Sequence, residues 1–261
     1  MNAKKQVSDL TLCGVKLLDQ RYALLRLTSA EPLPQMQPGQ FVEVRIDNSP
    51  STYLRRPISI HFVDKERNEL WLLVAAVGEG TRRLTRLPEG ALVNCVFPLG
   101  RGFTLPEKAD GQRVLLIGGG VGVAPLLYLG AELKARGGAP VFLLGGRTAS
   151  DLLELDEFRA VGEVFITTED GSAGEKGFVT QHSLLGKEHF SRVQTCGPLP
   201  MMKAVAAYAK ARGMDCEVSL ENMMACGVGA CLCCVEKTTA GNLCVCKEGP
   251  VFNINQLLWQ I

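Results

Sequence analysis

The chain carries six cysteines within twenty-one residues near its carboxyl terminus, and closely spaced thiols are equipped for chemistry. They are Cys226, Cys231, Cys233, Cys234, Cys244 and Cys246. Such thiols form disulfides in oxidising compartments, whereas in reducing cytosol they more often bind metals or take part in redox reactions. The spacing of the six thiols indicates which group they hold.

Four of the cysteines follow a known cluster pattern. The spacing is Cys226-x4-Cys231-x2-Cys234, with Cys246 after eleven intervening residues, and it matches the C-x4-C-x2-C…C pattern of plant-type [2Fe–2S] proteins. Structural zinc is the alternative, but it favours two paired C-x2-C units, and the spacing Cys244-x-Cys246 is not such a pair. We therefore predict a [2Fe–2S] cluster bound by these four thiolates.

The surrounding residues fit a cluster loop. Gly227 and Gly229 would let the backbone bend closely around the sulfides, where a Cβ atom would clash. Cys233 and Cys244 are left over as spectators, although the spacing also allows Cys244 to replace Cys246 as the fourth ligand. The remaining isolated cysteines, in apolar contexts, are expected to be small buried hydrophobes without chemistry of their own. They are Cys13, Cys95 and Cys196.

The composition excludes several classes of partner. The 28 basic and 27 acidic residues balance, which gives no electrostatic footprint for nucleic acid or an anionic membrane. No apolar run approaches the roughly 20 residues that a bilayer span needs. The first residues lack the unbroken apolar segment of a signal peptide. We expect a cytoplasmic protein that binds neither nucleic acid nor membrane.

Two kinds of folding pattern precede the cysteine-rich tail. Up to about residue 107, short apolar or alternating runs rich in Val, Ile and Phe are separated by Gly, Pro, Asp and Asn, which predicts an antiparallel barrel or sandwich. The strand-like runs are 41–46, 58–63, 69–77 and 91–99. The tail from 221 to 261 is loop-rich and too short to be stable without a metal or another staple.

From residue 111 strands and helices alternate, which predicts a doubly wound parallel sheet. The expected strands are 113–118, 140–146, 163–170, 192–197 and finally 216–221. Helices are expected after the first strand up to Gly137, from Ser150 as N-cap to Gly162, and from Leu199 to Gly213.

Two glycine-bearing turns follow strands of this sheet. GGGVGVAP (118–125) opens a helix, where Gly120 and Gly122 would let the backbone approach a pyrophosphate. CGP at 196–198 lies at the carboxyl end of another strand, where open α/β sheets bind ligands. Arg147 ends the second strand and could meet a 2′-phosphate or remain a solvated loop residue, so it does not distinguish NADP from NAD.

The amino-terminal half offers an anion site. LRRPISI (54–60) places two arginines and a hydroxyl on one strand, where Arg56 and Ser59 point to opposite faces. VGEGT (77–81) supplies a flexible turn with a second hydroxyl. The three histidines, His61, His182 and His189, are expected to be ordinary polar residues.

Taken together, these stretches resemble the ferredoxin–NADP reductase-like superfamily. RPIS resembles its R-x-Y-S flavin motif, GGGVGVAP its GGG-T-G-x-x-P loop, and CGPLPMM its CGP nicotinamide motif. The cysteine-rich tail, FPLGRGF (97–103) and TEDGSAGEKGFVT (168–180) are similar to the electron-transfer subunits of class 1B dihydroorotate dehydrogenases. The resemblance covers nearly the whole chain in the right order.

The resemblance implies an α+β multidomain fold. Its parts would be an antiparallel β-barrel FAD-binding domain (1–108), a doubly wound α/β NAD-binding domain (109–220) and a small [2Fe–2S] domain (221–261). One departure is Ile58, which occupies the place of a ring-stacking tyrosine in the wider superfamily. By motif, the cofactor-binding residues would be Arg56, Pro57, Ile58, Ser59, Leu73, Val74, Ala75, Gly80 and Thr81 for FAD, and Gly119, Gly120, Gly122, Cys196, Gly197 and Pro198 for NAD.

The resemblance also implies the function. Electrons would pass from an FMN-containing catalytic subunit, which oxidises dihydroorotate, through the [2Fe–2S] cluster and FAD to NAD+ in pyrimidine (UMP) biosynthesis. The expected assembly is a 2+2 heterotetramer, in which the partner docks near the cysteine tail and this chain alone does not oxidise dihydroorotate. The alternatives are a diaphorase-type subunit of a hydrogenase or of a ferredoxin:NADP transhydrogenase, and a redox-sensing or zinc-bearing adaptor that is not an enzyme.

Overall fold

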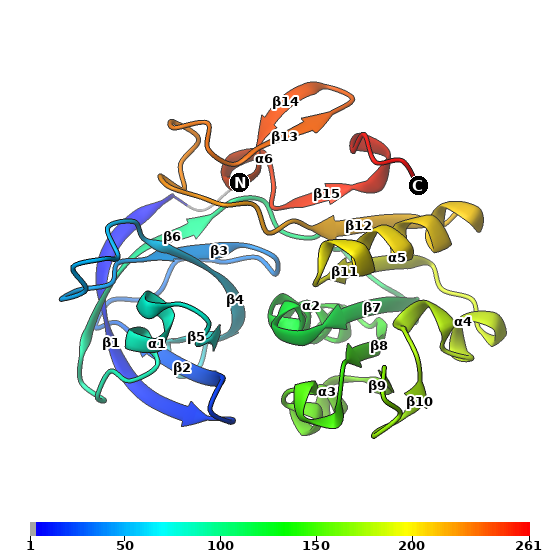
Figure 1. The fold of residues 1–261 in the computed structure, drawn as a ribbon, viewed down its shortest axis with the longest axis horizontal. Coiled ribbons are helices and arrows are strands. Elements are labelled where there is room, and N and C mark those ends of the chain that lie inside the picture. The colour runs from blue at the N-terminus through cyan, green and yellow to red at the C-terminus, as the bar shows by residue number, and fades with distance from the viewer. Residues whose placement is uncertain (1–3) are drawn as a thin grey trace. The chain divides into compact units, whose positions relative to one another are not determined.

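A computed structural model describes residues 4–261, and the chain forms two compact units. The first unit contains a closed antiparallel barrel with the strand order β1-β2-β5-β4-β3-β6 (Figure 1, blue to green). Its strands are β1 (Gln6–Leu17), β2 (Tyr22–Thr28), β3 (Phe41–Val44), β4 (Arg56–Asp64), β5 (Glu69–Ala75) and β6 (Leu92–Leu99). The short helix α1 (Glu79–Leu84) follows β5.

The barrel closes around alternate side chains of its strands. Leu70, Leu72 and Val74 of β5 are fully buried, and Leu72 and Val74 lie opposite Leu25 and Ala23 of β2. Successive side chains of a strand point to opposite faces, so such alternation fills the barrel interior. The expected barrel is confirmed. Strands β1 and β2 were not predicted, and residues 1–3 of the expected first domain lie outside the described residues.

The second unit is built on a sheet with the order β10-β9-β8-β7-β11-β12-β15. Its strands are parallel except β15, which runs antiparallel to β12. The bounds are β7 (Arg113–Gly119), β8 (Ala139–Gly146), β9 (Glu163–Thr168), β10 (Glu175–Lys176), β11 (Arg192–Cys196), β12 (Asp215–Ser219) and β15 (Val251–Asn253). The order reverses at β7, because β8 and β11, which follow it along the chain, lie on its two sides.

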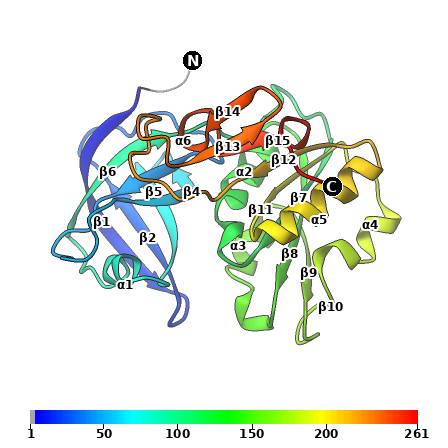
Figure 2. The ribbon, with the colours of Figure 1, turned by 45° about the horizontal axis from the view of Figure 1, so that its top comes forward.

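Helices cover both faces of this sheet. Figure 2 shows α2 and α3 on one face and α5 on the other. Their bounds are α2 (Ala124–Ala135), α3 (Leu155–Val161), α4 (Leu184–Lys187) and α5 (Leu199–Ala211), with 3-10 turns η1 (Gly120–Val123), η2 (Ala149–Asp151) and η3 (Val179–Gln181). Right-handed crossovers on either side of the reversal place helices on opposite faces. The predicted doubly wound sheet is confirmed.

Two expectations in this unit are wrong. The helix from Ser150 to Gly162 is instead the 3-10 turn η2 followed by the shorter α3. Asp151 Oδ2 accepts the Thr148 N–H, which closes a turn, and Glu154 at φ 50° interrupts helical geometry before Leu155. The strand around 216–221 is also not the last, because β15 from the tail extends the sheet.

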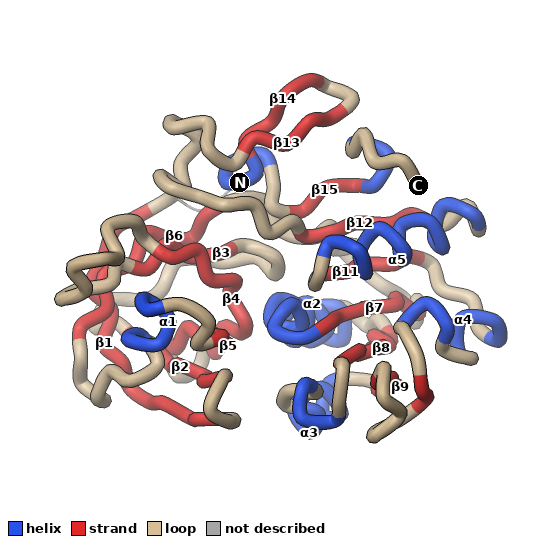
Figure 3. Tube along the Cα trace, in the orientation of Figure 1, coloured by secondary structure: helices blue, strands red, loops and turns tan. Residues whose placement is uncertain are grey.

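The tail contributes to both compact units. Residues 221–236 and 242–250 belong with the barrel, and 237–241 and 251–261 belong with the sheet unit. Much of the segment between β12 and β13 (Val235–Thr238) is loop (Figure 3). β13 pairs with β14 (Gly241–Cys244), which is followed by α6 (Val245–Glu248), and η4 (Ile254–Gln256) follows β15. No helix in residues 4–261 is both long and apolar enough to cross a bilayer.

Candidate functional site

The cluster segment brings the predicted cysteine ligands together in the first unit. The Cys231 N–H donates to Cys226 Sγ at 3.4 Å, and the Cys246 N–H donates to Cys234 Sγ at 3.3 Å. No three His, Cys, Asp or Glu side chains in residues 4–261 are placed to hold one metal ion, but these backbone bonds link the four cysteines as two pairs. Two pairs of thiolates are what the two irons of a [2Fe–2S] cluster require.

Backbone amides in the loop point at the same sulfurs. Val228 N–H donates to Cys226 Sγ at 3.5 Å, and Gly229 N–H donates to Cys246 Sγ at 3.1 Å. The bonds from Val228 and Cys231 lower the pKa of Cys226 to about 6, whereas burial raises the pKa of Cys246 to about 12. Amide donors stabilise thiolate charge, and iron binding supplies the energy to deprotonate the buried thiol. The donor set therefore fits an iron–sulfur cluster.

The loop adopts the tight turns that its glycines allow. Gly227 and Gly229 have φ values of 66° and 86°, in the left-handed region that side chains rarely adopt. Cys233 is exposed, and Cys244 Sγ is 4.0 Å from the Gly229 carbonyl oxygen. Every cysteine in the described residues is free of disulfides.

A pocket of about 350 Å³ on the barrel gathers the predicted phosphate ligands. Its lining includes Arg56, Gly80 and Thr81, and no carboxylate in the described residues forms an ion pair with Arg56. Thr81 Oγ1 accepts the Gly78 N–H at 3.0 Å and fixes the start of α1. The carboxylate of Glu79 shares the lining and accepts hydrogen bonds from Ser49 and Ser51. An unpaired guanidinium beside a glycine turn suits a pyrophosphate.

The residues of β4 and β5 that were predicted to bind FAD occupy adjoining barrel strands. Arg56, Pro57, Ile58 and Ser59 are half-buried at the start of β4. On β5, Leu73 and Val74 are buried and Ala75 is half-buried. The side chain of Val74 faces the barrel interior, so that only its backbone remains for a ligand on the outer face.

The two glycine motifs of the second unit meet at the reversal point of the sheet. Gly119 ends β7 and Gly120 begins η1, while Cys196 ends β11 and is followed by Gly197 and Pro198. A Cβ on Gly122 would lie 2.4 Å from Gly197 Cα, and one on Gly119 would lie 3.3 Å from Pro198 Cδ. The crevice at such a point is where open α/β sheets bind nucleotides.

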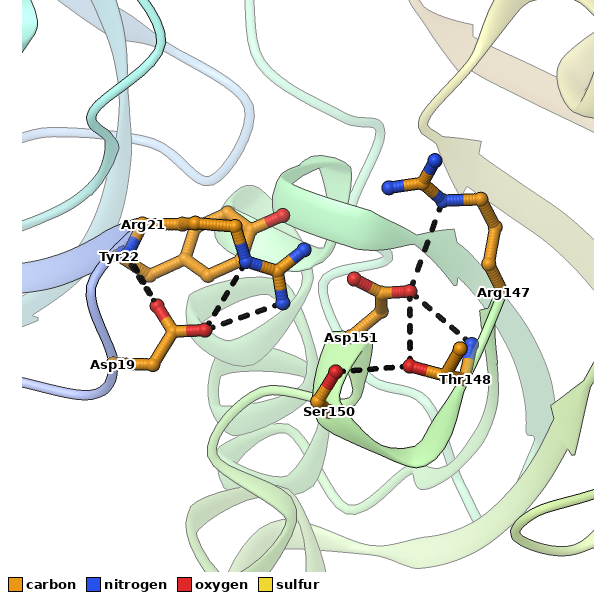
Figure 4. Close-up of polar contacts among 7 residues, drawn as sticks. All are labelled: Asp19, Arg21, Tyr22, Arg147, Thr148, Ser150 and Asp151. Carbon is orange, nitrogen blue, oxygen red and sulfur yellow. Dashed lines mark hydrogen bonds and ion pairs between the residues drawn. The ribbon is translucent and has the colours of Figure 1, made fainter.

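Arg147 lies just beyond β8 on the same edge of the sheet. Its Nε is 3.8 Å from Asp151 Oδ2, and its side chain is 76% exposed (Figure 4). Asp151 is buried and also accepts the Thr148 N–H at 3.1 Å. Asp151, four residues after Arg147, is therefore the acidic partner of this exposed arginine.

Two further residues near the expected ligands were not found from the sequence. Tyr22 pairs with Ala75, and its backbone N–H, like that of Arg21, donates to Asp19 Oδ1 (Figure 4). Glu43 on β3 is fully buried against the cluster loop. Neither position has a motif, and strand pairing or loop packing alone reveals them.

The fold and these sites define an NAD-linked oxidoreductase with an iron–sulfur segment, and comparisons with known proteins identify the family. Residues 221–258 match the iron-sulfur cluster binding domain of dihydroorotate dehydrogenase B, and 116–207 match the oxidoreductase NAD-binding domain. The dihydroorotate dehydrogenase B (NAD(+)) electron transfer subunit of Shouchella clausii is 41% identical over 85% of this chain and 86% of its own length. The subunit of Lysinibacillus sphaericus is 42% identical over 85% and 87%. The chain belongs to this family of electron transfer subunits.

Solved structures agree with the architecture. The NADH-dependent reduced ferredoxin-NADP oxidoreductase, a structure described for flavin-based electron bifurcation, superposes with a TM-score of 0.86 at 29% identity, covering 97% of this chain and 90% of that chain. A ferredoxin NADP+ reductase from Neisseria gonorrhoeae has the same fold, with a TM-score of 0.64 at 17% identity over 81% of this chain and 93% of that chain.

Proposed function

We propose that this chain is the electron-transfer subunit of an NAD+-dependent dihydroorotate dehydrogenase in pyrimidine biosynthesis. The observation that carries the proposal is the family's iron–sulfur domain at 221–258, which this chain joins to an NAD-binding domain at 116–207. Relatives about 40% identical carry the same subunit name. When bound, FAD and a [2Fe–2S] cluster supply the conversion between hydride transfer and single-electron transfer. The residues of this chain bind and orient these groups.

Each group has a set of residues that suits it. The pairs Cys226 with Cys231 and Cys234 with Cys246 would each hold one iron, supported by the amide donors to their sulfurs. Arg56 and the Gly78–Thr81 turn would hold the FAD pyrophosphate, and β4 and β5 would carry its ring. Gly122 and Gly197 approach each other closely where the strand order reverses at β7, and NAD would bind there.

The partner is proposed to be an FMN-containing catalytic subunit that binds dihydroorotate, in a 2+2 heterotetramer. The relatives are named as subunits, which supports a separate catalytic chain. The cluster segment also exposes apolar side chains suited to docking. Met223, Val228 and Leu232 are exposed by 84%, 43% and 65%, and Leu232 is held outward at φ 58°. The proposed location is the cytoplasm.

A second candidate is the subunit of a ferredoxin:NADP transhydrogenase. The observation in its favour is the TM-score of 0.86 to the NADH-dependent reduced ferredoxin-NADP oxidoreductase. Sequence identity to that protein is 29%, against 41% to the Shouchella clausii subunit over a comparable share of the chain, which favours the dihydroorotate reading.

The test is reconstitution with an FMN-containing dihydroorotate dehydrogenase catalytic subunit. We expect the purified complex to form orotate from dihydroorotate with NAD+ as acceptor, and this chain alone to form none. The mass of the complex checks the 2+2 stoichiometry. Equal rates of dihydroorotate oxidation with and without the second subunit would contradict the division of labour, and NADPH-dependent ferredoxin reduction by this chain's native complex would favour the second candidate.

A further inference from the structure

A buried carboxyl lies under the cluster loop without a hydrogen-bond partner. Glu43 is in the middle of β3, where it pairs with Pro57 of β4 and Val96 of β6. The residue is 0% exposed, and neither carboxyl oxygen has a hydrogen-bond partner among the described residues. Burying an unpaired carboxyl costs several kcal/mol by order of magnitude. An apolar residue would be less costly at this position on stability grounds alone.

The glycine turn of the cluster loop rests directly on this carboxyl. A Cβ on Gly227 would lie 2.6 Å from Glu43 Cγ, 3.1 Å from Glu43 Oε1 and 3.1 Å from Leu99 Cδ1. Gly227 follows Cys226 and precedes Val228, whose N–H donates to the Cys226 sulfur. The carboxyl therefore lies against the turn that aims an amide at a proposed ligand.

The nearest arginine does not neutralise the carboxyl by direct contact. Arg55 donates to the backbone carbonyls of Glu43 and Asn94 at 3.2 and 3.0 Å, and to Asn94 Oδ1 at 2.5 Å. Burial raises the pKa of Glu43 to about 7, opposed by Arg55 and Arg56. When it is ionised, this carboxylate has no hydrogen-bond partner among the described residues, and in a low-dielectric setting its charge acts strongly on neighbouring charges.

We propose that Glu43 is a positioning residue that seats the Gly227 turn and lowers the reduction potential of the iron–sulfur cluster. The proposal rests on the ligand set of the proposed function. Reducing a cluster adds one negative charge, so a carboxylate beside it makes reduction less favourable. Net charge and nearby dipoles are among the factors that set cluster potentials.

The test is a redox titration of the cluster in the complete complex, followed by electron paramagnetic resonance. Glu43→Gln keeps the shape and removes the charge. We expect it to shift the one-electron equilibrium toward the reduced cluster by about tenfold, which is about 59 mV upward for one electron. Glu66→Gln makes the same charge change at an exposed position of the barrel, and we expect no shift.

An unshifted potential in a cluster-bearing Glu43→Gln protein would overturn the proposal. If that variant does not retain iron, Glu43→Asp keeps the charge one methylene farther away, and a shift in its potential supports the proposal. An unchanged potential in Glu43→Asp, or loss of iron from both variants, assigns the residue a folding role and rejects the proposal. Failure of the proposed function would appear separately, as a wild-type complex without a cluster signal or without orotate formation.

Discussion

The thiols of the cluster segment differ both in their exposure and in the hydrogen bonds that they accept. Cys234 and Cys246 are buried, Cys226 is half-buried, and Cys231 is exposed like the spectator Cys233. Backbone N–H groups reach the sulfurs of Cys226, Cys234 and Cys246. Amide donors of this kind mark sulfurs that carry negative charge when they bind metal.

Single serine replacements test the ligand set. Replacing Cys226, Cys231, Cys234 or Cys246 is expected to lower iron well below the about two atoms per chain of a [2Fe–2S] protein, because one of the two irons would lose a thiolate ligand. Cys233→Ser and Cys244→Ser are the controls and should keep iron and the visible cluster absorbance. Retention of iron in Cys246→Ser with loss in Cys244→Ser would instead identify Cys244 as the fourth ligand.

At the scale of elements, the NAD-binding region depends on two loops that belong to neighbouring strands. The loop after β7 and the turn after β11 approach so closely that Gly122 has no room for a side chain. Their spacing along the chain is long, and only the adjacency of β7 and β11 brings them together. A glycine at this point allows close packing as well as approach to a ligand.

Gly122→Ala is expected to raise the KM for NADH about tenfold, because the new methyl group must push the Gly197 backbone away. Overpacking of this kind costs about 1–3 kcal/mol, and 1.4 kcal/mol corresponds to tenfold. The measurement is NADH oxidation with an artificial acceptor, with FAD and iron contents checked. Gly186→Ala, where the added atom meets nothing within 4 Å, should match wild type. An unchanged KM in Gly122→Ala would contradict the proposal that NAD binds in this crevice.

At the scale of the whole molecule, the cysteine-rich tail belongs to the core of each unit. Residues 221–236 and 242–250 fold with the barrel, whereas β15 adds an antiparallel strand to the nucleotide-binding sheet. Phe252 on β15 is 2% exposed and lies opposite Val218 of β12. So short a segment needs stabilisation from outside itself, and packing against both units therefore contributes to it as well as metal binding.

Phe252→Ala is expected to lower the free energy of unfolding by about 3–5 kcal/mol, the usual cost of emptying a buried phenylalanine site. Anaerobic denaturant unfolding of the complete chain would measure it. Phe178→Ala removes the same side chain from a position that is 60% exposed and serves as the control. Equal stability of the two variants would show that β15 is not part of the folded core.

Prediction from the sequence succeeded where the pattern was local. The cysteine spacing, the glycine loop at 118–125 and the apolar runs of β7, β8 and β11 depend on nearby residues. It failed at Ser150, because the Asp151 side chain and the positive φ of Glu154 override helical propensity there. Strand β1 was not predicted, because much of it is half-exposed and its register depends on distant partners in β2 and β6.

The sequence by itself determined the succession of a β-rich half, an α/β half and a cysteine-rich tail, because side-chain period and ligand spacing are written along the chain. Only the tertiary structure decided that Glu43 lies under Gly227, that Gly122 meets Gly197 and that the tail divides between two units. These contacts join residues far apart in the chain, and they exist only once strands have paired and burial has fixed which groups lose contact with water.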